Sequence, residues 1–107
     1  MNATRILLAG LFAVQVLAGL ARAQEIGQAG RGLALAQRLC AQCHAVQKQQ
    51  TESPNPDAPA FREIASTPGM TSIALSAALQ TSHATMPNIM LDAEDRADLI
   101  SYIIGLK

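Results

Sequence analysis

Apolar positions recur every three or four residues in parts of this chain and lose all regularity in others. Such a period is typical of helices with one apolar face. The period, or a capping residue followed by apolar positions, predicts helices over residues 31–43, 61–65, 72–80 and 92–107. No segment alternates as a β-strand does. The predicted class is therefore a small all-α protein.

Residues between these segments predict caps and loops. Thr71 and Asp92 are suitable N-caps for the third and fourth segments. Polar residues and prolines mark residues 47–60 and 81–90 as loops. In the third segment we expect one side of the helix to be apolar through Ile73, Ala74, Ala77 and Ala78.

The N-terminal segment differs from the rest, because residues 6–20 are apolar except for Gln15. A basic start, this apolar run and the small residues of Ala21-Arg22-Ala23 indicate an export signal cleaved after residue 23. The alternative is a retained membrane anchor, although the run is shorter than the ~20 residues that usually span a bilayer. We therefore expect residues 1–23 to be a signal peptide and residues 24–107 to be the folded domain, located in the periplasm.

Composition limits what this domain can do. Removal of Arg5 and Arg22 leaves six basic and eight acidic residues, with no basic run, so nothing suggests nucleic-acid binding. Phe61 and Tyr102 are its only aromatic residues apart from histidine. A core of so few large side chains is thin, and small domains are commonly stabilised by a disulfide, a metal or a cofactor.

The two cysteines stand in the stretch RLCAQCHAV, where Cys40 and Cys43 are followed by His44. A dithiol oxidoreductase places its Cys-x-x-Cys at a helix N-terminus, whereas this pair falls at the C-terminus of a predicted helix, where the dipole opposes a thiolate. A zinc site would need these three residues and His83, but structural zinc ligands usually come as two spaced pairs. Cys-x-x-Cys-His is also the attachment motif of c-type haem. Its spacing lets two sulfurs reach one porphyrin edge while the imidazole faces the iron.

A haem iron bound in this way takes a second axial ligand. Met86 is favoured, because it lies in a predicted loop and is followed by Pro87. Met90 fits a core position better but stays a candidate, and Met70 is expected to pack or cap. His83 is the remaining rival and would give bis-histidine ligation. A thioether raises the reduction potential relative to a second imidazole.

With these motifs the chain resembles the class I monohaem cytochromes c over nearly all of residues 30–106. DLISYI (98–103) and TMPNIM (85–90) resemble the family's C-terminal segment and methionine loop. The resemblance implies that Gly32 permits a close helix crossing at Tyr102. It further implies that the Pro59 carbonyl accepts a hydrogen bond from His44, and that Phe61 and Leu99 pack on the haem. In this comparison Ala36 stands where many relatives have an aromatic residue, and the lysine ring of mitochondrial relatives is missing.

The family resemblance implies a cytochrome c fold of about three to five helices around one covalently attached haem c. The expected function is single-electron transfer in the periplasm, with no enzymatic activity, between a dehydrogenase donor and an oxidase or reductase acceptor. The membrane is a partner only if the signal segment is retained. Two alternatives stay open: a permanently bound haem subunit of a periplasmic dehydrogenase, and a haem protein that binds small ligands or reduces peroxide.

Overall fold

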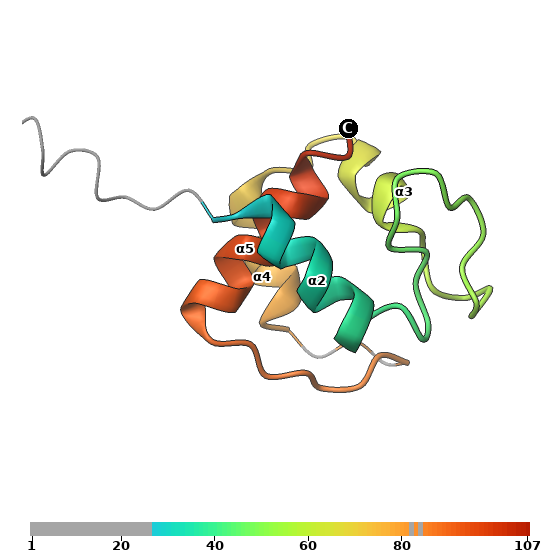
Figure 1. Cartoon of the computed structure of the whole chain (residues 1–107), viewed down its shortest axis with the longest axis horizontal. Coiled ribbons are helices and arrows are strands. Elements are labelled where there is room, and N and C mark those ends of the chain that lie inside the picture. The colour runs from blue at the N-terminus through green and yellow to red at the C-terminus, as the bar shows by residue number, and fades with distance from the viewer. Residues whose placement is uncertain (1–26, 82, 84) are drawn as a thin grey trace, which may run out of the picture.

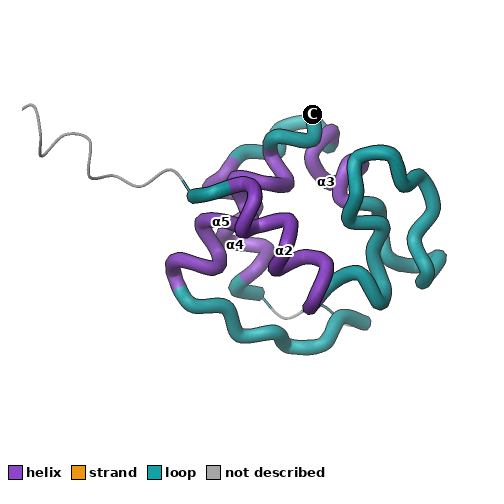
Figure 2. The backbone as a smooth tube through the Cα atoms, viewed as in Figure 1, coloured by secondary structure: helices purple, strands orange, loops and turns teal. Residues whose placement is uncertain are grey.

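The described part of the chain consists of helices joined by loops. The computed structural model describes residues 27–107 except 82 and 84, so the predicted signal peptide lies outside the described residues. These residues form four α-helices and no strand, which confirms the all-α prediction (Figures 1 and 2). The helices are α2 (Ala29–Leu39), α3 (Phe61–Ser66), α4 (Ser72–Leu79) and α5 (Ala93–Ile104). Among the described residues (27–107 without 82 and 84), no helix is long and apolar enough to cross a membrane.

Helix α5 is the centre of the fold, because α2, α3 and α4 all pack against it. The crossing of α2 over α5 (Figure 1) is close enough to require glycine. A Cβ at Gly32 would lie 2.1 Å from the carbonyl oxygen of Asp98 and 2.8 Å from Cβ of Tyr102. The close crossing at Tyr102 is therefore present in the structure.

A buried carboxylate ties the start of α2 to α5. Gln28 precedes α2 without a side-chain cap of its own, and its N–H instead donates to Oδ1 of Asp98 at 2.6 Å. Nε of Arg31 lies 3.1 Å from Oδ2 of Asp98, which makes an ion pair although Oδ2 accepts no aligned hydrogen bond. Asp98 is only 3% exposed. It thus supplies from α5 the negative charge that the N-terminus of α2 favours.

Local capping signals explain where the later helices begin. Thr71 Oγ1 accepts from the N–H of Ala74 at 3.1 Å, and Oδ1 of Asp92 accepts from the N–H of Asp95 at 2.8 Å. Both predicted caps are confirmed. The Glu63 carboxylate, which accepts from the N–H of Ala60 at 3.0 Å, also secures the start of α3.

The first helix is shorter than predicted, because α2 ends at Leu39 and not near Cys43. The N–H groups of Cys40 and Ala41 both donate to the Ala36 carbonyl, and this widened turn ends the helix. A tight turn follows, in which the N–H groups of Cys43 and His44 donate to the Cys40 carbonyl at 3.1 and 2.9 Å. The three motif residues therefore lie on a turn after the helix.

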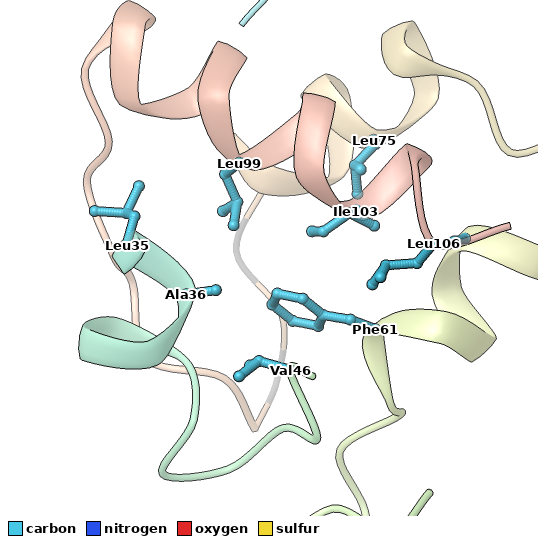
Figure 3. Close-up of a cluster of buried hydrophobic side chains, with 9 residues drawn as sticks. Leu35, Ala36, Val46, Phe61, Leu75, Leu99, Ile103 and Leu106 are labelled. Atoms are coloured by element: carbon cyan, nitrogen blue, oxygen red, sulfur yellow. The ribbon is translucent and has the colours of Figure 1, made fainter. Parts of the chain in front are cut away.

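The core lies between α5 and the other elements. Figure 3 shows the Phe61 ring among Ala36, Val46 and Ile103, with Leu99 and Leu75 farther along α5 and α4. The side of α4 that carries Ile73 does not face the core, since Ile73 is 84% exposed and Leu75 is the buried residue. The reason is that α4 is apolar on nearly every side, so its period does not select a face.

Candidate functional site

A cavity of about 430 Å³ lies beside this core and is lined mainly by apolar side chains. Its volume falls in the range of ~300–1,000 Å³ that is typical of small-molecule and cofactor sites. All seven site residues expected from the sequence line it: Cys40, Cys43, His44, Pro59, Phe61, Met86 and Leu99. Residues up to 59 positions apart in the chain are thus gathered around one space.

His44 is held firmly at one wall of the cavity. Its Nδ1 lies 2.7 Å from the Pro59 carbonyl oxygen, the contact that the family resemblance implied. A carbonyl only accepts hydrogen bonds, so Nδ1 carries the proton and Nε2 of the neutral ring keeps a free lone pair. The buried Phe61 ring packs against the imidazole, with 5.4 Å between centroids and a tilt of 49°.

The cysteines lie next to His44, are partly buried and are not joined to each other by a disulfide. Burial raises the pKa of the Cys40 thiol. A raised pKa keeps a thiol protonated at neutral pH, which is the opposite of the activation found in dithiol oxidoreductases. The surroundings of Cys40 therefore do not favour thiolate chemistry.

The zinc alternative requires four side chains to converge. Among the residues that the structure describes, no group of three or more His, Cys, Asp or Glu side chains is placed to hold one metal ion. Cys40, Cys43, His44 and His83 line the cavity without forming such a set.

The methionines differ in how they lie relative to the cavity. Met86 lines it and is partly buried, and Pro87 beside it also contributes to the wall. Met90 does not line it and is 84% exposed, so its expected place in the core is wrong. Met70 packs against the core, as expected, and also reaches the cavity. The exposed side chain of His83 lines the same cavity as Met86.

Several lining residues were not singled out from the sequence as part of a site. Leu75 and Leu79 are one turn apart on α4, and Ile103 is one turn after Leu99 on α5. Spacing of four residues places each pair on one helix face. In α5 this spacing could have indicated which face lines the cavity. In α4 it could not, because nearly all residues of that helix are apolar.

Comparisons with known proteins give the family of the chain. The family model for cytochrome c matches residues 29–107. The chain is 32% identical over 100 residues to cytochrome c-552 of Bradyrhizobium diazoefficiens, which covers 94% of this chain and 95% of that protein. No solved structure gave a significant match.

The chain belongs to the cytochrome c family. It is accordingly a haem electron carrier that binds haem c covalently and exchanges electrons with redox protein partners. The site fits this cofactor, because two thiols, an imidazole with a free lone pair and a thioether all line one apolar cavity.

Proposed function

We propose that the chain is exported to the periplasm and carries single electrons there on one haem c with His/Met axial ligation. The proposal assigns the thioether bonds to Cys40 and Cys43 and the axial positions to His44 and Met86. The observation that carries it is the His44–Pro59 hydrogen bond of 2.7 Å on the wall of a cavity that Met86 also lines. When bound, the haem supplies the one-electron redox couple.

In this proposal each wall residue has a physical task. The Pro59 carbonyl fixes the tautomer of His44 and the orientation of its ring. Phe61 and Leu99, which are both buried, exclude water from the cavity and hold its shape. An apolar, dry surrounding and a thioether ligand both favour the reduced iron, so we propose a relatively oxidising carrier.

Two axial protein ligands leave no position for a substrate, which supports a carrier and not an enzyme. The partners proposed for it are a dehydrogenase as donor and an oxidase or reductase as acceptor. The N-terminal signal supports the periplasm as the compartment. Mass spectrometry of the exported protein tests this part: we expect a chain that begins at Gln24 and carries one haem. A chain that keeps residues 1–23 contradicts cleavage and favours a membrane anchor.

The ligand assignment is tested by substitution of the methionines in the haem-loaded protein. The ferric wild-type protein should show the weak red absorption band of an iron–thioether bond. We expect Met86→Ala to abolish this band and to lower the reduction potential, because a neutral sulfur ligand favours Fe(II). Met90→Ala is the matched control and should leave both unchanged, since its side chain is exposed and outside the cavity wall. Loss of the band only in Met90→Ala contradicts the assignment.

A further inference from the structure

The loop that carries Met86 also carries the second histidine of the chain on the same cavity wall. His83 lines the cavity together with Met86, three residues away. The N–H of Met86 donates to the His83 carbonyl at 3.3 Å, so a turn joins the two residues. An imidazole and a thioether are thus presented to one space from one short segment.

The two histidines differ in how their rings are held. Nδ1 of His44 is engaged with Pro59, whereas the exposed His83 ring makes no hydrogen bond with any other residue that the structure describes. A ring that is not engaged can turn either nitrogen toward a metal. The chain has two histidines in total, so once His44 holds one axial position His83 is the remaining imidazole.

We propose that His83 is a reserve axial ligand, which binds the haem iron when the Met86 thioether is lost from it. This inference rests on the proposed function, because it takes His44 and Met86 as the ligands of the intact protein. The resulting bis-histidine state has a lower reduction potential than the His/Met state. The same chain and cofactor therefore have two ligation states, selected by which of two loop residues faces the iron.

The rival for this role is Met70, which also reaches the cavity. Its backbone carbonyl accepts from Nζ of Lys107 at 2.8 Å, and its side chain packs against the buried core. These contacts hold Met70 in a packed position near the C-terminus. If Met70 bound the iron in Met86→Ala, the thioether band would persist. If His83 bound it, the band would be absent.

The experiment compares haem-loaded Met86→Ala with the double variant Met86→Ala/His83→Gln, using absorption and electron paramagnetic resonance of the ferric state. We expect the single variant to lack the thioether band yet stay low-spin, with the signal of two imidazole ligands. The double variant should be high-spin. Met86→Ala/Met70→Leu is the matched control and should remain low-spin. Met86→Leu repeats the test of Met86→Ala with a side chain of about the same apolar volume as methionine.

Cyanide binding gives a second readout that does not depend on the spectral assignment. If His83 occupies the iron for about nine-tenths of the time, the apparent cyanide dissociation constant rises about tenfold over the double variant. A high-spin single variant, or a double variant that stays low-spin, overturns the proposal. A thioether band that persists in Met86→Ala overturns this inference, because a methionine and not His83 then binds the iron. If the reduction potential is also unchanged, Met86 is not the ligand, and the proposed ligation is overturned together with this inference.

Discussion

The two walls of the cavity are built in different ways. The His44 side, which we define as residues 40–61, is fixed by buried residues and by hydrogen bonds that reach across the chain. The Val46 carbonyl accepts from the Tyr102 hydroxyl at 2.6 Å, and the N–H of Phe61 donates to the Ala45 carbonyl at 2.9 Å. Ala45 in turn donates to Oγ of Ser53 at 2.9 Å. The scaffold itself thus holds this wall.

The Met86 side, which we define as the described part of residues 81–91, has no buried residue and no helix. Its contacts include the turn between His83 and Met86 and a long hydrogen bond from Arg96 to the Leu91 carbonyl at 3.5 Å. The difference teaches that one of the two proposed axial ligands is placed by the fold and the other by a loop. Substitutions on the first side should change stability, and substitutions on the second should change ligation.

The largest effect is expected at Cys40 and Cys43 of the His44 side, to which we propose that the cofactor is joined. Cys40→Ser combined with Cys43→Ser should abolish covalent haem attachment and leave a chain without cooperative unfolding. The reason is that the cavity of about 430 Å³ lies beside the core and needs the cofactor to complete its packing. Mass spectrometry and thermal circular dichroism measure the two losses. A haem-free double variant that folds cooperatively would falsify the claim.

The next effect concerns the helix crossing that supports the His44 side. Gly32→Ala places a methyl against the backbone of Asp98, and neither helix can yield without moving the other. We expect a loss of about 1–3 kcal/mol in the free energy of unfolding, measured by denaturant titration. Gly30→Ala is the matched control, because a Cβ there meets nothing within 4 Å. It should stabilise the protein by up to about 1 kcal/mol through helix propensity. Equal shifts in the two variants contradict the packing argument.

Features that depend on neighbouring residues could be predicted from the sequence. The caps at Thr71 and Asp92 are local, because each side chain bonds an N–H three residues later. The Cys-x-x-Cys-His motif is likewise visible in neighbouring residues, although the turn on which it lies was predicted to be the end of a helix. Gly32 was predictable through the family resemblance, which carries information on long-range packing that one sequence alone lacks.

Features set by distant contacts could not be predicted. Met90 lies in a loop without a period, so nothing local indicates that its side chain faces solvent. Asp98 interrupts the apolar pattern of α5, and its partner Gln28 is 70 residues away. The pairing follows from the helix crossing, which the sequence pattern of either helix does not specify by itself.

A smaller effect is expected from one hydrogen bond of the His44 side. Tyr102→Phe removes the donor to the buried Val46 carbonyl and should cost about 1–3 kcal/mol. Burial raises the pKa of Tyr102, so the native state keeps its proton at pH values where the unfolded chain loses it. The wild-type protein should therefore lose stability as the pH rises above about 10.

Unfolding curves of the wild-type protein and Tyr102→Phe between neutral and alkaline pH measure both effects. The difference in free energy of unfolding between the two proteins should be constant at pH values below the ordinary tyrosine pKa and should shrink above it. The thioether band should be unchanged at neutral pH, because the hydrogen bond that is lost holds Val46, on the side that does not carry Met86. A weakened band in Tyr102→Phe would contradict the separation between the two sides.

The smallest effect on stability is expected on the Met86 side, where the same substitution should also weaken the binding of Met86 to the iron. Proline restricts the unfolded chain, so Pro87→Ala should cost about 0.4–1 kcal/mol in the free energy of unfolding.

Pro54→Ala is the matched control: Pro54 is also an exposed loop proline, but it lies on the His44 side and does not line the cavity. Both variants should lose similar stability, whereas only Pro87→Ala should lose the thioether band at a lower temperature than the wild-type protein. The cause is that Pro87 fixes the backbone angle directly after Met86, which limits the directions in which the sulfur can move. Identical band melting in the two variants would mean that the loop does not set the position of Met86.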